Sequence, residues 1–241
     1  MKGMDIFQGI LRTESIETVA TDTKKFRFSV SECTPLIPTK KSFQYQAGQF
    51  LSLEFTKTAW RAYSIASCPK EKYIEFVVKY VDGGTASDIF WKTKVGDLFP
   101  FKGPFGDLKL SENTNAHLVF CATGTGIAPF RSMILTEAAK TPPRRMTLLY
   151  GGKNAEDIAY LDEISNWSEH LEVKLGLSRT NEANTDLEWE PCRITKFLEE
   201  REEDKNTEFY ICGNGSMVKS VNELLETKNI AKENIFLERF N

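Results

Sequence analysis

The tetrapeptide Arg61-Ala62-Tyr63-Ser64 combines side chains that could together hold a flat, phosphate-bearing cofactor. It opens an expected strand over 61–67, in which Arg61 and Tyr63 share one face and Ser64 points to the other. A guanidinium can bind phosphate with two hydrogen bonds, an aromatic ring can stack on an isoalloxazine, and a hydroxyl can reach the polar ring edge. These contacts suit a flavin. An ordinary edge strand with a half-buried tyrosine is the alternative interpretation.

A second motif, Gly83-Gly84-Thr85-Ala86-Ser87, follows a strand expected over 73–80. The two glycines can adopt the positive φ angles of a tight turn. Thr85 and Ser87 stand where a short helix is expected to begin, and the N–H groups at a helix N-terminus bind anions. A plain turn with a hydroxyl N-cap is the alternative. The position after the strand favours the pyrophosphate of the same flavin.

The second half of the chain alternates short apolar runs with amphipathic stretches. This alternation predicts a parallel sheet with crossover helices. The expected strands cover 118–122, 146–150, 171–177, 209–212 and 235–237, and the expected helices cover 130–140, 156–167, 194–200 and 217–228.

Two glycine-containing turns end the first and fourth of these strands. Gly124-x-Gly126-x-x-Pro129 follows the first, and its proline suits the first turn of a helix. Cys212-Gly213 ends the fourth. In the strand order 3-2-1-4-5 the first and fourth strands are neighbours, so both turns should line the crevice where a dinucleotide binds. A cysteine that is merely part of the core is the alternative reading of Cys212.

In this order and spacing the motifs resemble the ferredoxin–NADP reductase superfamily of flavoproteins. The likeness covers nearly the whole chain and includes Gly103-Pro104-x-Gly106. It implies two domains: an antiparallel six-stranded β-barrel that binds FAD, then an α/β parallel-sheet domain that binds NADP, with NAD possible. We expect the boundary in the polar stretch 111–115, which gives domains of 1–112 and 113–241.

The resemblance also implies roles for individual residues around the flavin. Arg61 would bind its phosphates, Tyr63 would stack on the isoalloxazine, and Ser64 would hydrogen-bond N5. Val78 and Lys79 would lie along the edge of the ring. The other flavin-binding residues would be Ala62, within the same strand, and Gly84, Thr85 and Ser87, at the pyrophosphate.

A further set of residues would serve the nicotinamide dinucleotide. By the same resemblance, Gly124, Thr125 and Gly126 would bind its pyrophosphate. Cys212 would lie against the nicotinamide, with Gly213 beside it. The catalytic residues implied are therefore Ser64, Cys212 and Glu238, because Glu238 would share a proton path with Ser64.

Two positions bear on the choice of partner and nucleotide. Phe240 resembles a terminal aromatic that covers the second flavin face, but Asn241 follows it, as in reductase components of bacterial oxygenases. Ser178-Arg179 stands where NADP-selective relatives bind the 2′-phosphate, and Lys153 and Arg193 could assist. The stretch 181–190 is acidic, which suits a phosphate poorly. On balance we expect NADPH.

Composition excludes several other classes of function. The five cysteines are scattered and form no C-x₂-C cluster, so we expect no iron–sulfur centre, no other metal site and a reducing cytoplasmic setting. We found no signal peptide and no apolar run long enough for a membrane span. A pI near 5.6 argues against nucleic-acid binding.

The charge is distributed unevenly, and this bears on protein partners. Residues 1–112 carry a net charge of +3 and residues 113–241 carry −6, within a total of −3. A mildly basic flavin half could attract a small acidic redox protein, although plain solubilising lysines would give the same count.

The leading hypothesis is therefore a monomeric ferredoxin– or flavodoxin–NADP reductase. One alternative is an NADH-dependent flavin reductase or the reductase component of an oxygenase. A third is an electron-transfer subunit that has no turnover of its own.

Overall fold

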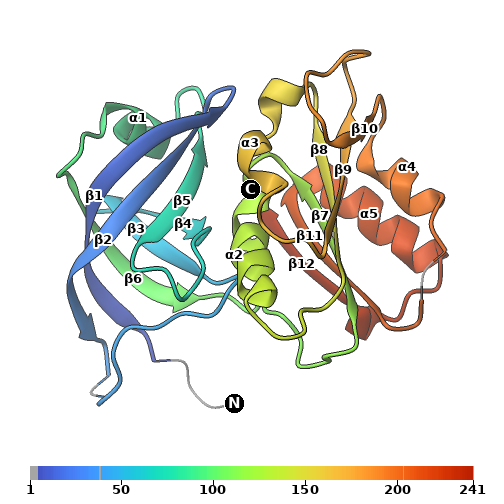
Figure 1. Ribbon diagram of the computed structural model, residues 1–241. Helices are drawn as coiled ribbons and strands as arrows, with labels where there is room; N and C mark the ends of the chain where they lie inside the picture. Colours follow the sequence, from blue (N-terminus) through green and yellow to red (C-terminus); the bar gives the residue numbers. More distant parts are fainter. Residues whose placement is uncertain (1–4, 38, 203, 241) are drawn as a thin grey trace.

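The computed structural model describes residues 5–37, 39–202 and 204–240 as two packed domains (Figure 1). The first is a curled antiparallel sheet with the order β4-β3-β6-β1-β2-β5. Its outermost strands, β4 and β5, contact each other, so the sheet closes toward a barrel. These strands are β1 (Phe7–Ala20), β2 (Thr23–Pro35), β3 (Phe50–Thr56), β4 (Ala59–Ser64), β5 (Ile74–Lys79) and β6 (Leu98–Phe105).

The barrel interior is filled mainly by aromatic rings. Phe26 and Phe28 point inward from β2, as alternate residues of one strand do, and Phe76 meets them from β5. Phe90 of helix α1 (Thr85–Lys92) closes one end of this core, with its ring centroid 4.7 Å from that of Phe26. The helix that follows the glycine turn is thus anchored to the barrel by one buried ring.

The second domain is a parallel sheet with the order β10-β9-β8-β7-β11-β12. Its strands are β7 (His117–Thr123), β8 (Met146–Gly152), β9 (Leu171–Leu177), β10 (Glu188–Glu190), β11 (Thr207–Asn214) and β12 (Ile235–Phe240). Its helices are α2 (Ile127–Ala138), α3 (Leu161–Ile164), α4 (Ile194–Glu199) and α5 (Gly215–Thr227). Short 3₁₀ turns occupy Gly124–Gly126, Ala155–Asp157 and Lys232–Asn234.

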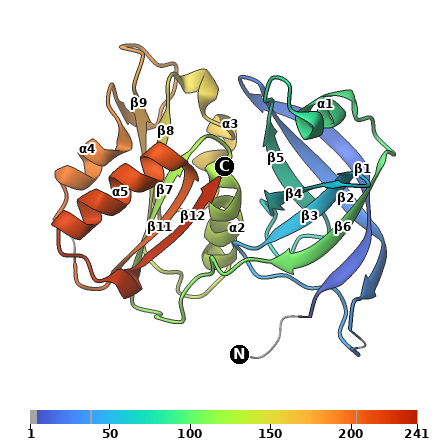
Figure 2. The ribbon, with the colours of Figure 1, turned by 180° about the vertical axis from the view of Figure 1, so that it is seen from behind.

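Alternation along β7 assigns each face of this sheet to its own helices. Phe120 and Ala122 pack with α2, whereas Val119 and Cys121 pack with α4 and α5. Helix α2 consequently lies between the sheet and the barrel, and α4 and α5 cover the far face (Figures 1 and 2). The predicted fold class, an antiparallel barrel followed by a parallel α/β sheet, is confirmed.

Two local expectations were wrong. The helix expected over 156–167 is only a 3₁₀ turn and the short α3, because Tyr160 adopts a left-handed conformation with φ of 64° between them. The edge strand β10 was not expected, since its Glu-Trp-Glu sequence is not an apolar run. It is held beside β9 partly by an ion pair of 2.9 Å between Lys174 and Glu188.

In the part of the chain that the structure describes, no helix has both the length and the apolar character needed to cross a bilayer.

A buried ion pair fastens the end of α2 and yields a stability prediction. Glu137 accepts hydrogen bonds from the Nη2 of Arg144 at 2.7 Å and from its backbone N–H at 3.1 Å. Burial alone would raise the pKa of Glu137, but the hydrogen bonds from Arg144 and Lys140 lower it. Glu137→Ala would leave the Arg144 guanidinium buried without its carboxylate and should cost about 3–5 kcal/mol in urea unfolding.

The control is Lys219→Ala, which breaks an exposed pair with Glu223 and should cost less than about 1 kcal/mol. The depressed pKa makes the contribution of Glu137 fully present above the unfolded value of about 4.3, and it is lost as pH falls below it. Equal costs for the two variants at neutral pH would contradict this account.

Candidate functional site

The Arg61 strand, β4, forms one edge of the barrel sheet, and its side chains do not alternate between exposed and buried positions. Arg61 is exposed, and its Nη1 donates to the carbonyl oxygen of Trp60 at 2.9 Å. Ala62 is also exposed, whereas Ser64 is buried. The guanidinium is therefore free to turn toward a ligand, while the serine hydroxyl is directed into the protein.

Tyr63 is half-buried and held by the aromatic core. Its ring meets Phe90 edge to face, with 5.1 Å between ring centroids, and Phe76 lies at 5.9 Å. Burial raises the pKa of Tyr63 to about 12, so its hydroxyl stays protonated at neutral pH. Since Phe90 belongs to α1, the ring that is expected to stack on a flavin is fixed by the helix that is expected to bind its pyrophosphate.

The turn before α1 has an open side at Gly83 and Thr85 and a closed side at Ser87. Gly83 has φ of 68°, and a Cβ there would meet no atom within 4 Å. Thr85 is exposed at the start of the helix, where N–H groups lack partners within the helix. The Ser87 hydroxyl, in contrast, is buried and accepts a hydrogen bond from the N–H of Val81 at 3.1 Å. Ser87 thus closes the turn from inside.

Val78 and Lys79 end β5 with opposite orientations. The Val78 side chain is buried in the barrel core, whereas Lys79 is exposed. A ring along this edge would therefore meet the backbone of Val78 and not its side chain.

The two glycine turns of the second domain are pressed together. Strands β7 and β11 are parallel neighbours, as predicted. A Cβ on Gly126 would lie 2.2 Å from the carbonyl oxygen of Cys212, and a Cβ on Gly213, which has φ of 140°, would lie 2.4 Å from Thr123 Oγ1. Thr123 Oγ1 also accepts from the N–H of Asn214 at 3.1 Å. Glycine is required at both positions by this close approach.

Gly124, unlike Gly126 and Gly213, faces open space. Its φ is 54°, and a Cβ would meet nothing within 4 Å. The hydroxyl of the fully buried Tyr150 donates to the carbonyl oxygen of Gly124 at 2.8 Å and accepts from the N–H of Ala159 at 3.2 Å. The half-buried Thr125 follows within the same 3₁₀ turn, which leads into α2. The loop is fixed by Tyr150, has open space at Gly124 and leads into a helix, and these features suit the binding of a pyrophosphate.

Cys212, Glu238 and Ser64 meet where the two domains join. Cys212 is fully buried and lies opposite Glu238 in the parallel register of β11 and β12. Ser64 Oγ donates to Glu238 Oε1 at 3.4 Å, a long hydrogen bond that connects the barrel to the second domain. The end of β12 reaches this junction in both views (Figures 1 and 2).

The environment of this group shifts two pKa values upward. Burial raises the pKa of the Glu238 carboxyl. Burial, with the negative charge of Glu238, also raises the pKa of the Cys212 thiol well above its ordinary value. The cysteine is therefore a neutral, polarizable wall and not a nucleophile, while the glutamate can carry a proton.

Ser178 and Arg179 lie exposed at the carboxyl end of β9. The Ser178 N–H and hydroxyl both donate to the carbonyl oxygen of Gly152, at 3.1 and 3.2 Å. The N–H of Arg179 donates to the carbonyl oxygen of Lys153 at 2.8 Å. Two exposed cationic side chains, Arg179 and Lys153, thus share one edge of the sheet. Arg193 is also exposed, at the start of α4.

Sequence reasoning missed Thr123 and Tyr150. Each stands at the end of a parallel strand beside a glycine turn, and that position is the signal that could have identified them. The role expected of Phe240 rests on a side chain that lies outside the described part of the molecule. Within the described ranges, no group of three or more His, Cys, Asp or Glu is placed to hold a metal ion.

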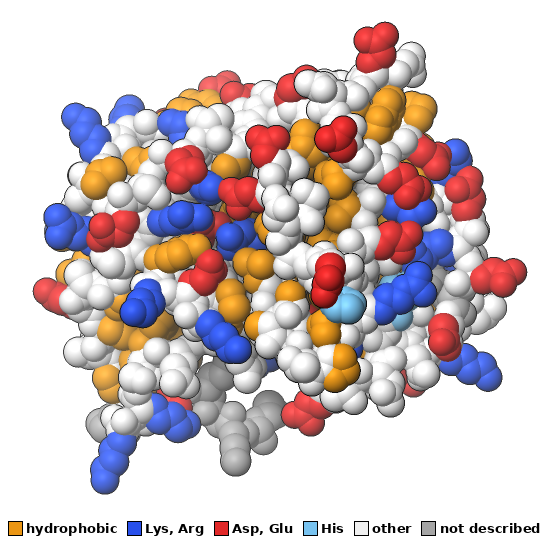
Figure 3. Space-filling view, viewed as in Figure 1, with side chains coloured by type: hydrophobic (Ala, Val, Ile, Leu, Met, Phe, Trp, Pro, Cys, Tyr) orange, Lys and Arg blue, Asp and Glu red, His pale blue; other side chains and the backbone are white. Residues whose placement is uncertain are grey.

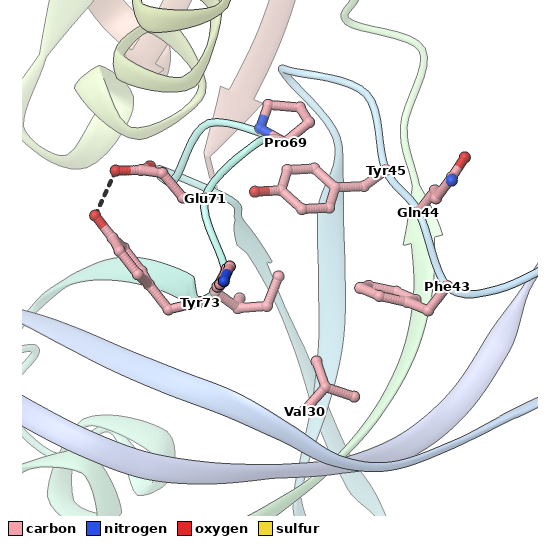
Figure 4. A pocket seen from close by; sticks show the side chains of 9 residues that line it. Val30, Phe43, Gln44, Tyr45, Pro69, Glu71 and Tyr73 are labelled. Atoms are coloured by element: carbon pink, nitrogen blue, oxygen red, sulfur yellow. Dashed lines mark hydrogen bonds between the residues drawn. The ribbon is translucent and has the colours of Figure 1, made fainter.

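One pocket lies away from these residues. It has a volume of about 320 Å³ and is lined by Phe43, Tyr45 and Tyr73, whose hydroxyl donates to Glu71 (Figure 4). Ile74, the first residue of β5, also lines it, whereas Lys79 ends that strand. The pocket therefore lies at the opposite end of β5 from the expected flavin edge.

Comparisons with known proteins agree with the two-domain reading. A family described as the oxidoreductase FAD-binding domain matches residues 11–110, and the oxidoreductase NAD-binding domain matches residues 120–223. Among curated relatives, the flavohemoprotein of Bacillus subtilis is 30% identical over 207 residues, which are 82% of this chain and 52% of that protein. The xylene/toluene monooxygenase electron transfer component of Pseudomonas putida is 28% identical, over 93% of this chain and 66% of that protein. The chain thus spans about half to two thirds of these relatives.

Solved structures share the fold over almost the whole chain. The Amycolatopsis cytochrome P450 reductase superposes with a TM-score of 0.84 and 23% identity, and covers 99% of this chain and 72% of its own. A ferredoxin NADP⁺ reductase from Neisseria gonorrhoeae, with bound FAD and NADP, has a TM-score of 0.81 and 24% identity, with 96% and 98% covered. The chain belongs to the ferredoxin–NADP reductase superfamily and is an oxidoreductase with an FAD-binding domain followed by an NAD-binding domain.

Proposed function

We propose that this chain moves electrons from NADPH, through FAD, to a small one-electron carrier such as a ferredoxin or a flavodoxin. The contact between Ser64 of the barrel and Glu238 of the second domain, beside Cys212, carries this proposal. It brings the strand expected to hold the flavin ring against the strand end expected to hold the nicotinamide. Such proximity is needed because reacting atoms must approach within about 3–3.5 Å.

The residues around the expected flavin fit FAD. When bound, FAD supplies the conversion between two-electron nicotinamide chemistry and single-electron transfer. Arg61 would bind its phosphates, Tyr63 would present a fixed ring face, and Ala62 would lie beneath the cofactor. Gly84 and Thr85 would offer backbone N–H groups to the pyrophosphate. Ser87 would support this turn from within, as its hydrogen bond to the N–H of Val81 indicates.

Glu238 would hold a proton and Ser64 would transfer it at the polar edge of the isoalloxazine ring. The raised pKa of Glu238 extends the pH range over which this carboxyl stays protonated. Ser64, already hydrogen-bonded to it, can pass that proton on. Cys212 would orient the nicotinamide by packing, because its buried thiol is neutral.

The pyrophosphate of the nucleotide would bind at the turn formed by Gly124, Thr125 and Gly126, and the open space above Gly124 supports this. Gly213 would lie beside Cys212 at the nicotinamide. Arg179 and Lys153 would then discriminate NADPH from NADH by charge. Both are exposed at the same sheet edge. Arginine is suited to a 2′-phosphate because it binds phosphate with two parallel hydrogen bonds.

The partner is proposed to be acidic because the FAD-binding half carries a net positive charge. On the face shown in Figure 3, acidic and basic side chains are interspersed over both domains, so the support comes from net charge and not from one patch. Two Pseudomonas relatives, the electron transfer component of xylene/toluene monooxygenase and the reductase component of phenol 2-monooxygenase, favour a second candidate, the reductase component of an oxygenase. Turnover with ferredoxin or flavodoxin, compared with turnover with free flavin, separates these candidates.

We also propose a monomer in the cytoplasm. The five cysteines are all free, which suits a reducing compartment. Gel filtration of the purified protein tests the first statement, and fractionation of the source cells tests the second.

Stopped-flow reduction of the purified yellow protein tests the proposed function. NADPH should bleach the flavin rapidly, and Arg179→Ala should raise the NADPH concentration at half-maximal rate about ten- to a hundredfold, since a charged hydrogen bond contributes about 1.5–3 kcal/mol. The NADH response should not change. The matched control is Arg145→Ala, another exposed arginine, which lies just before β8 at the opposite edge of the sheet from Arg179. A flavin that neither nucleotide reduces would refute the proposal.

Arg61→Ala should release the flavin during purification, because the phosphates lose their bidentate partner. The flavin-to-protein absorbance ratio of the purified variant measures this, with Arg12→Ala, another exposed arginine of the barrel, as the control. Full flavin occupancy in Arg61→Ala would argue against the phosphate-binding role.

Cys212→Ala should retain the flavin but slow its reduction severalfold, because the nicotinamide loses a wall of its site. Stopped-flow rates at saturating NADPH provide the measurement. An unchanged rate would mean that Cys212 is only a core residue.

A further inference from the structure

Helix α2 carries a buried arginine that joins the two domains directly behind the nucleotide loop. Arg131 lies about one helical turn after the start of α2, and its side chain is 6% exposed. Its Nη1 donates to the carbonyl oxygen of Ala66 at 2.9 Å. The next residue, Ser132, donates from Oγ to the carbonyl oxygen of Ser67 at 2.6 Å. Two consecutive residues of α2 therefore bind two consecutive residues of the barrel.

A fully buried carboxylate of the barrel completes this contact. Glu75 is 0% exposed, and its Oε2 accepts from Arg27 Nε at 2.7 Å. Its Oε1 accepts from the hydroxyl of Tyr160 at 2.6 Å and lies 3.4 Å from Arg131 Nη1. The guanidinium of Arg131 also lies over the Tyr160 ring, 5.2 Å from its centroid. Arg131, Glu75 and Tyr160 form what we call the interdomain latch.

The latch connects the elements that carry the proposed site. Ala66 follows Ser64 closely in the chain, and its N–H donates to the carbonyl oxygen of Glu75 at 2.8 Å. Glu75 belongs to β5, the strand that ends at Lys79 beside the expected flavin edge. Arg131 is on the helix that begins at the nucleotide loop. The latch thus connects the segment that follows β4, strand β5 and helix α2.

Stability alone is a poor reason for this arrangement. A buried ion pair is often no more stabilising than apolar side chains of similar volume, because desolvation offsets the attraction. What charged, hydrogen-bonded contacts add is direction: the planar guanidinium accepts only a narrow set of orientations. An apolar interface would tolerate sliding of α2 on the barrel, and the latch restricts it.

We propose that Arg131 and Glu75 are positioning residues, which hold α2 and the nucleotide loop in register with the Ser64 strand and thereby align the nicotinamide with the flavin. This inference rests on the proposed function, because it concerns hydride transfer between these two rings. Neither residue touches either ring. The expected effect is nevertheless large, since a misplacement of about 1 Å can lower a rate about a hundredfold.

The experiment is stopped-flow reduction by NADPH of the flavin-loaded wild type, Arg131→Met and the double variant Arg131→Met/Glu75→Gln. Arg131→Met should lower the limiting rate about ten- to a hundredfold. Flavin content and the apparent Kd for NADPH should change less than about threefold, since no contact with either cofactor is lost. The charge-transfer absorbance between the stacked rings should weaken in parallel.

The matched control is Lys25→Met, which breaks another interdomain ion pair, between the buried Lys25 of β2 and the partly exposed Glu163 of α3, at 2.6 Å. Lys25 also lies 5.8 Å from the Tyr160 ring centroid, but it makes none of the hydrogen bonds that join Arg131 to Ala66 and Tyr160 to Glu75. If positioning is the role of the latch, Lys25→Met lowers stability in urea but leaves the limiting rate within about threefold of wild type. The double variant removes both charges of the Arg131–Glu75 pair, and it also replaces the carboxylate that Arg27 binds. It should remain as slow as Arg131→Met, because neither substitution restores the contact between α2 and the barrel.

The outcomes are distinct. A slowed limiting rate in both latch variants, with an unaffected rate in Lys25→Met, supports the proposal. Equal slowing in all three variants, or a change in Kd alone, would overturn it. Should Arg131→Met fail to fold, the double variant carries the test by itself. A wild type that NADPH and NADH both fail to reduce would instead contradict the proposed function.

Discussion

The close parallel pairing of β7 and β11 is the constraint on which the rest of the site depends. It presses Gly126 against the carbonyl oxygen of Cys212 and Gly213 against Thr123, so neither glycine can carry a side chain. From this contact the nucleotide loop leads into α2, which packs on the barrel, while β12 brings Glu238 beside Cys212. A change in strand register would displace all of these elements together.

Much of this arrangement could be predicted from the sequence, because it follows from local patterns. Apolar runs separated by helical stretches predicted the parallel sheet, and the strand order placed the two glycine turns side by side. The contacts that could not be predicted are those between distant charged residues. Nothing in the local sequence indicates that Glu75 and Arg131 meet, or that a left-handed Tyr160 divides an expected helix. Such pairs depend on how two complete domains pack.

Among the site residues, too, the sequence predicts the surroundings of some side chains and not of others. The exposure of Arg61 does not follow from strand alternation, which places it on the same face as Tyr63. The half-burial of Tyr63 follows from its position beside an aromatic core. The inward hydroxyl of Ser87 does not, because its acceptor role depends on the path of the turn at Val81. Whether a hydroxyl faces a ligand or its own backbone is decided by turn geometry, which residue type alone does not specify.

The Ser64–Glu238 contact explains why an interdomain latch made of charges is useful. At 3.4 Å this hydrogen bond is long, and burial raises the pKa of the Glu238 carboxyl. In the proposed mechanism Glu238 exchanges a proton, and a group with that role must remain weakly bound and cannot also fix the domain geometry. The proposed latch would take the second task. Arg131 donates to the Ala66 carbonyl oxygen at 2.9 Å and Tyr160 donates to Glu75 at 2.6 Å, so the short contacts across the domains lie away from Ser64 and Glu238.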